Sequence, residues 1–196
     1  MIIGHVCCRN RFILGIGAGW REDEYRAYGY EFPRPKERFE QLEETLQICR
    51  LMWTDVDPSF NGSHFQIDGA SAPPLPEIQP PVCIGTSGEK VGIPLAARAS
   101  DIWNTVWRGN IDSLLRKRDV MLRCLEADGR SETDVQFSLT IEAGLPQSTS
   151  EAAEFRTQLE EFITHGFEHF VLDFGNRSSA AETELFISEL MEPLRH

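Results

Sequence analysis

The chain has 196 residues and a formal net charge of −12, so it is long enough for one domain with a sizeable core. Hydrophobic residues make up 41% of it and charged residues 26%, which is ordinary for a soluble globular protein. The acidic balance argues against a general nucleic-acid binder and against an anionic membrane surface as partner. No apolar run approaches the ~20 residues of a transmembrane helix, and the opening residues carry charge too early for a secretory signal.

The cysteines give no sign of a metal centre or a disulfide framework. Their count is odd and no CxxC pair occurs, and no other metal-ligand spacing is present. We therefore expect buried thiols in a reducing cytoplasm, and no metal site. The five cysteines are Cys7, Cys8, Cys49, Cys83 and Cys124.

In chain order, the first predicted strand covers residues 12–16 and runs into a loop of small residues that ends at Trp20. After two prolines, apolar residues recur at steps of three and four from Phe39 to Trp53. This spacing predicts an amphipathic helix over about 36–53.

Residues 55–81 form a long proline-rich stretch without helix or strand periodicity. Within it, Asn61-Gly62 predicts a small hairpin over 60–65. Connections of this length are uncommon inside compact domains and often serve function. We therefore predict that the stretch is a lid or a wall beside the substrate.

The next stretch predicts a strand–loop–helix–strand unit and organises the rest of the chain. A strand over 82–84 leads into the loop Gly85-Thr86-Ser87-Gly88, a helix follows over 95–99, and a second strand lies within 102–106. Pro94 is expected to delay or kink the helix. Backbone N–H groups of such a loop can hold a phosphate. The alternative is a loop that needs glycine only for its turn.

Alternating helices and strands complete the pattern. A helix capped by Asn110 precedes a strand over 135–141, and a helix from about Glu151 precedes a strand over 170–174. Ser179 with Glu182 predicts a capping box for a last helix. Strands that alternate with helices imply a parallel sheet covered by helices. Five visible strands favour an open sheet, because a closed eight-stranded barrel takes ~250 residues.

These residues resemble a known family, the bacterial luciferase-like monooxygenases, and most closely its coenzyme F-420 (deazaflavin)-dependent oxidoreductases. From residue 11 to 107 many individual residues match the family, and from there to the end the resemblance is weaker and lies only in the pattern. The matching pieces are Phe12–Trp20, Glu24, Tyr28-Gly29, Arg38-Phe39, Leu42–Glu44, Met52-Trp53, Gly62, His64-Phe65, Gln79–Pro81, Ile84-Gly85, Ser87–Lys90, Ala96–Ala99 and Asp101–Asn104.

The family fold is an α/β barrel of the TIM (β/α)8 type. Matched to it, residues 1–196 look like a single α/β domain that forms a partial barrel from about the fourth strand onward. About five parallel strands with covering helices are expected, and 55–81 is a long loop insertion. The first three β/α units, roughly a hundred residues, have no counterpart in the chain.

The resemblance also implies cofactor-binding residues. The loop Gly85, Thr86, Ser87 and Gly88 resembles the family's phosphate loop, and Lys90 is either a further positive charge near the cofactor or a solvated surface lysine. Gly17 and Gly19 would let a cofactor approach a strand end. Trp20 is either a pocket wall or a core residue, and His64 either a proton relay or a surface histidine. These alternatives stay open on the sequence alone.

The function implied by the resemblance is hydride transfer between the deazaflavin coenzyme F-420 and a small organic substrate. The first alternative is an FMN-dependent monooxygenase, since the two cofactors share a ring shape and a phosphate. The second alternative, from another class, is a non-catalytic remnant or interaction subunit. Expected partners are a small-molecule substrate and, through exposed sheet edges, a second copy of the chain.

Overall fold

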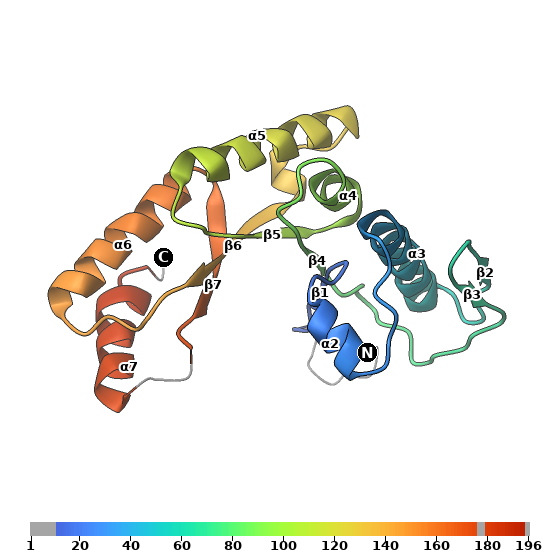
Figure 1. Ribbon diagram of the computed structural model, residues 1–196, viewed down its shortest axis with the longest axis horizontal. Coiled ribbons are helices and arrows are strands. Elements are labelled where there is room, and N and C mark those ends of the chain that lie inside the picture. Colours follow the sequence, from blue (N-terminus) through green and yellow to red (C-terminus); the bar gives the residue numbers. More distant parts are fainter. Residues whose placement is uncertain (1–10, 176–178, 195–196) are drawn as a thin grey trace. The chain divides into compact units, whose positions relative to one another are not determined.

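The computed structural model describes residues 11–175 and 179–194, and Figure 1 draws them in colour. Five strands follow the order β1-β4-β5-β6-β7 in one sheet, and β2 pairs with β3 in a second. β1 pairs with β4, and β6 with β7, in parallel. The expected partial (β/α)8-type arrangement of parallel strands with helices is confirmed.

The bounds of the elements are as follows. The strands are β1 (Leu14–Ile16), β2 (Phe60–Asn61), β3 (Gln66–Ile67), β4 (Val82–Gly85), β5 (Ile102–Val106), β6 (Gln136–Glu142) and β7 (Phe167–Asp173). The helices are α2 (Glu22–Ala27), α3 (Pro35–Thr54), α4 (Gly92–Ala99), α5 (Ile111–Ala127), η1 (Glu132–Asp134), α6 (Thr149–Thr164), α7 (Ala180–Phe186) and η2 (Ile187–Met191).

The described chain falls into two compact units. The first holds residues up to 103 together with 120–135, and the second holds 104–119 together with the part from 136 onward. The expectation of a single domain over 1–196 stays a prediction.

In the first unit, helices α3 and α4 supply much of the core around β4. Leu42, Leu46 and Trp53 lie on the stripe of α3 that the sequence predicted, and all three are buried. Val82 and Ile84 of β4 are fully buried. Burying each of these side chains is worth about 1.5–3 kcal/mol relative to leaving it exposed. Because a helix places all three residues of the α3 stripe on one face, this burial stabilises α3 against the core.

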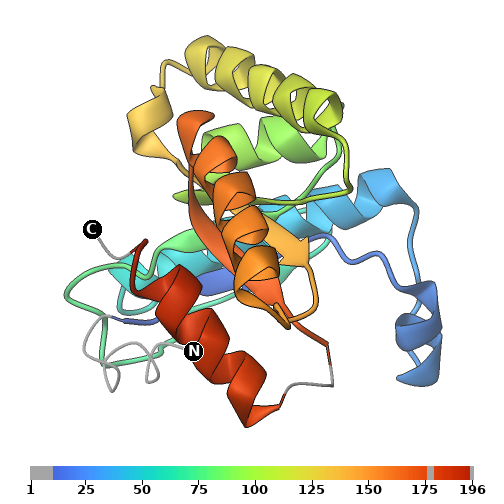
Figure 2. The same cartoon turned by 90° about the vertical axis from the view of Figure 1, so that its left-hand side faces the viewer.

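In the second unit, the alternation of β6 separates an apolar face from a polar one. Phe137, Leu139 and Ile141 are buried, and α6 runs alongside β7 in both views (Figures 1 and 2). The ring of Phe162 on α6 lies 6.5 Å from that of Phe170 on β7. The residues between the apolar ones, Ser138 among them, belong to the opposite face because side chains alternate along a strand.

Most predicted elements are confirmed, with three differences. The hairpin predicted over 60–65 is present as β2 and β3 and extends to Ile67, with the Gly62 N–H donating to the Phe65 carbonyl at 2.9 Å. Helix α4 begins at Gly92, before Pro94, so the expected delay is wrong: Pro94 lies in the first turn, where its missing N–H costs nothing. Helix α2 was not predicted, and β7 begins earlier than expected.

Candidate cofactor loop and strand-end pockets

The carboxyl ends of β1 and β4 lie against each other at two glycines. A Cβ on Gly17 would lie 3.2 Å from the Gly85 carbonyl oxygen, which is tighter than an ordinary contact. A Cβ on Gly85 would meet nothing within 4 Å. Gly17 therefore permits the close approach of the two backbones, while Gly85 leaves its own surface uncovered by side chains.

Thr86 lies at the centre of the loop that follows β4. Its hydroxyl accepts a hydrogen bond from the Gly88 N–H at 3.3 Å, and Gly88 in turn accepts from the Ile93 N–H at 2.8 Å. A Cβ on Gly92 would collide with the Thr86 hydroxyl and lie 3.3 Å from a ring carbon of Phe39. The loop is therefore held in one shape by its own contacts, and Gly92 is required for that shape.

Gly88 differs from Gly92 in that a side chain would fit there. The nearest atoms to a Cβ on Gly88 are both 3.8 Å away, and its φ is not positive. The residue is exposed. Open space over this backbone is what a ligand held by loop N–H groups would need.

The helix that follows the loop has no side-chain cap. Val91 occupies its N-cap position and makes no side-chain hydrogen bond there. Backbone N–H groups at an uncapped helix start carry the positive end of the helix dipole and favour an anion. Lys90 is exposed beside this helix start.

Gly19 and Trp20 take other roles than the loop glycines. Gly19 has φ +73, and a Cβ there would collide with the Tyr25 hydroxyl, so glycine is needed for the turn into α2. Trp20 is 82% exposed, with the Arg21 guanidinium 5.8 Å from its ring centre. The alternative that Trp20 is a core residue is therefore wrong, and its role as a pocket wall stays a prediction.

His64 lies on the hairpin β2–β3, which α3 separates from β4 in Figure 1. Its Nε2 lies 3.3 Å from a carboxylate oxygen of Glu40 on α3. The structure thus brings together Gly17, Gly85, Thr86, Ser87 and Gly88, and it leaves His64 outside that group. A proton-relay role for His64 remains a prediction without further support.

The same hairpin is bound to α3 through one carboxylate. Glu44 accepts hydrogen bonds from the backbone N–H groups of Ser63, His64 and Phe65 at 2.6, 2.9 and 2.9 Å. Desolvation alone would raise the pKa of Glu44, but the three backbone donors together lower it below its usual value. The tip of the predicted lid is therefore attached to α3 in the ionised state of Glu44.

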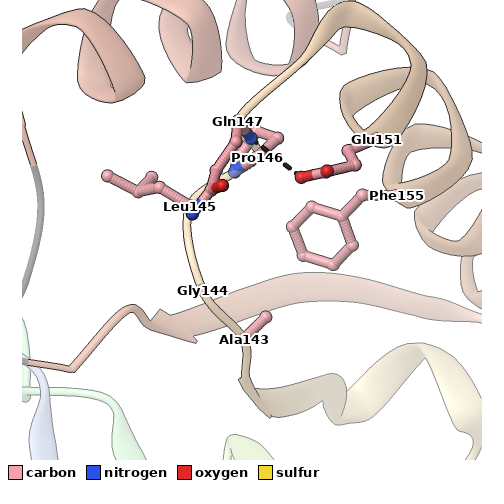
Figure 3. A pocket seen from close by; sticks show the side chains of 7 residues that line it. All are labelled: Ala143, Gly144, Leu145, Pro146, Gln147, Glu151 and Phe155. Carbon is pink, nitrogen blue, oxygen red and sulfur yellow. Dashed lines mark hydrogen bonds between the residues drawn. The ribbon is translucent and has the colours of Figure 1, made fainter.

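The second unit has a pocket that the sequence did not indicate (Figure 3). It measures about 500 Å³ and lies where β6 ends and α6 begins. Its wall includes Leu145, Pro146 and Phe155, and the Glu151 carboxylate accepts from the Gln147 N–H at 2.9 Å. A neighbouring pocket lies at the ends of β6 and β7, with Glu142, Asp173 and Phe174 in its lining. Ligands of parallel α/β proteins bind at such strand ends.

A row of polar side chains crosses the polar face of the second unit. Asn104 Nδ2 donates to Ser138 Oγ at 2.8 Å, and Ser138 Oγ lies 2.8 Å from His169 Nδ1. Thr140 donates to Asn104 Oδ1 at 3.0 Å. Ser138 is fully buried. The signal for this row in the sequence is the alternation of Ser138 and Thr140 with the apolar residues of the predicted strand.

The described residues contain no group of three or more His, Cys, Asp or Glu side chains arranged to hold a metal ion. Cys49, Cys83 and Cys124 are free thiols of intermediate exposure, and burial raises the pKa of each. Cys7 and Cys8 lie outside the described residues. Over the same part of the chain, none of the helices has the length and apolarity to cross a membrane.

One family profile covers most of the chain. A family profile described as luciferase-like monooxygenase matches residues 8–191. An F420-dependent glucose-6-phosphate dehydrogenase of Kineococcus radiotolerans is 29% identical over 145 residues, which cover 74% of this chain and 42% of that protein. The chain therefore spans less than half the length of this relative.

Solved structures show the same fold. An F420-dependent secondary alcohol dehydrogenase in complex with an F420-acetone adduct matches with a TM-score of 0.84 at 17% identity, over 100% of this chain and 73% of that one. The oxygenating constituent of 3,6-diketocamphane monooxygenase from Pseudomonas putida, in complex with FMN, matches with a TM-score of 0.57 at 15% identity. The match covers 80% of this chain and 48% of that one.

Proposed function

Because the chain belongs to the luciferase-like monooxygenase family, we propose that it acts in hydride transfer between the deazaflavin coenzyme F-420 and a small organic substrate. The observation that carries the proposal is the loop after β4. It presents an uncovered backbone at Gly85 and Gly88, next to the close approach of Gly17 and ahead of an uncapped helix. Relatives named as F420-dependent dehydrogenases support this choice of cofactor.

The residues of the first unit would hold the phosphate of the cofactor. N–H groups of the loop and the Gly92 N–H at the start of α4 would donate to it, with the Ser87 hydroxyl as a further donor and Lys90 as a positive charge nearby. The next two residues of α4 do not contribute, because the Ile93 N–H donates to the Gly88 carbonyl and Pro94 has no N–H. The bound deazaflavin ring supplies the hydride chemistry. The chain's own contribution is to bind and orient the cofactor. This requires a loop that is already held in one shape, and the contacts of Thr86 hold it.

FMN is the second candidate cofactor, in a monooxygenase reaction. Its support is the FMN-bound monooxygenase among the structures of the same fold. A loop that recognises a phosphate serves both cofactors equally, so the residues at the loop favour neither. A cytoplasmic location and self-association remain predictions.

Titration of the purified protein with F-420 and with FMN, followed by fluorescence, tests the proposal. One of the two should bind, and the same ring without its phosphate should bind more weakly. Gly88→Val should reduce affinity for the phosphate-bearing cofactor at least ~10-fold, or ~1.4 kcal/mol, since lost charge-assisted hydrogen bonds are worth about 1.5–3 kcal/mol each. Failure of both cofactors to bind would refute the proposed function for this chain.

A further inference from the structure

Trp103 connects the interior of the first unit to the loop that we assign to the cofactor phosphate. It is the second residue of β5 and its side chain is wholly buried. Its indole Nε1–H donates to the carbonyl oxygen of Thr86 at 3.0 Å. This buried aromatic side chain therefore makes a directed contact with the loop backbone in addition to its packing.

This contact fixes the direction of one peptide group. In a trans peptide the carbonyl and the following N–H point in opposite directions. Since the Thr86 carbonyl points toward the buried indole, the N–H of the same peptide group, that of Ser87, points the opposite way. The Thr86 hydroxyl is also fixed, by the Gly88 N–H and by its packing on Gly92.

We infer that Trp103 is a positioning residue for the phosphate site, through its hydrogen bond to Thr86. The inference rests on the proposed function. The physical basis is preorganisation: a loop peptide group that is already held in one direction loses less freedom when an anion binds to the loop. Because the wholly buried Trp103 would act through the loop backbone, its loss should weaken the phosphate contacts and leave recognition of the ring unchanged.

Trp53 offers a matched control within the same unit. It is 2% exposed, close to the burial of Trp103. Its indole nitrogen is buried without a hydrogen-bond partner in the part of the chain that the structure describes. Trp53→Phe and Trp103→Phe therefore remove the same atoms from two buried sites, but only the second removes a hydrogen bond to the loop.

The test measures the affinity of both variants and the wild type for F-420 and for the same deazaflavin without its phosphate. Trp103→Phe should weaken F-420 binding about fivefold to tenfold, as expected for one hydrogen bond, and leave the phosphate-free ligand unchanged. Trp53→Phe should change neither. Equal losses for both ligands, or no loss in Trp103→Phe, would overturn the inference. A wild type that binds neither ligand would overturn the proposed function and this role with it.

A measurement on the unsubstituted protein covers the case in which Trp103→Phe does not fold. Inorganic phosphate is titrated into ¹⁵N-labelled wild type, and the indole N–H resonances are followed by NMR. The Trp103 resonance should shift along the same saturation curve as the loop amides, while the Trp53 resonance stays in place. Loop amides that shift without Trp103 would overturn the inference.

Discussion

Gly92→Ala should destabilise the protein although alanine is the better helix former. The added Cβ would collide with the Thr86 hydroxyl, and it would lie 3.0 Å from the Thr86 Cβ and 3.3 Å from the Phe39 ring. Overpacking of this kind costs about 1–3 kcal/mol, and replacing glycine recovers about 0.4–1 kcal/mol through the unfolded chain. The collision with Thr86 places the cost in the upper half of that range, so the net loss should be ~1–2.6 kcal/mol, or ~2–10 °C in Tm for a chain of this size.

Gly88→Ala is the matched control for that prediction. It lies in the same loop, and its added Cβ would have only ordinary contacts at 3.8 Å. Its stability should equal that of the wild type or exceed it by up to about 1 kcal/mol, through the unfolded chain. Urea denaturation of both variants, with the slope of each transition compared as well as its midpoint, measures the difference.

A double variant identifies the atom responsible. Thr86→Ala removes the hydroxyl with which the new Cβ collides, so Gly92→Ala should cost less in that background, by at least ~0.5 kcal/mol of coupling. The reasoning is refuted if Gly92→Ala is as stable as the wild type, or if Gly88→Ala loses as much. Additive effects of Thr86→Ala and Gly92→Ala would show that another contact is responsible.

Two further predictions concern the hairpin and the polar row. Glu44→Gln should speed proteolytic cleavage within the hairpin β2–β3. Since the pKa of Glu44 is lowered in the fold, the attachment is complete above the ordinary glutamate pKa and is lost as pH falls through the lowered value. Cleavage that is unchanged by the variant and by acid would contradict this. Ser138→Ala should cost about 1–3 kcal/mol in thermal unfolding, because it removes the hydrogen bonds of a fully buried hydroxyl to the partly buried groups of Asn104 and His169, each worth about 0.5–1.5 kcal/mol. An unaltered Tm would show that water replaces the hydroxyl.

Local signals in the sequence were enough for most of the secondary structure. The stripe on α3, the Asn110 cap of α5 and the capping box at Ser179 depend on residues within a few positions of each other. Helix α2 was missed because its six residues contain no buried side chain, and hence no apolar periodicity to detect. The start of β7 was misplaced because Glu168 and His169 interrupt its apolar pattern.

The candidate site also combines features that the sequence predicts with contacts that only the folded structure shows. The sequence by itself determined the family resemblance and the Gly-rich loop, because glycine content and strand–loop–helix order are properties of neighbouring residues. Only the tertiary structure decided that Trp103 bonds to Thr86, that Gly17 meets Gly85, and that Glu44 holds the hairpin. These contacts join residues 17 or more positions apart. Whether they form depends on how strands and helices pack, and neither local propensity nor periodicity carries that information.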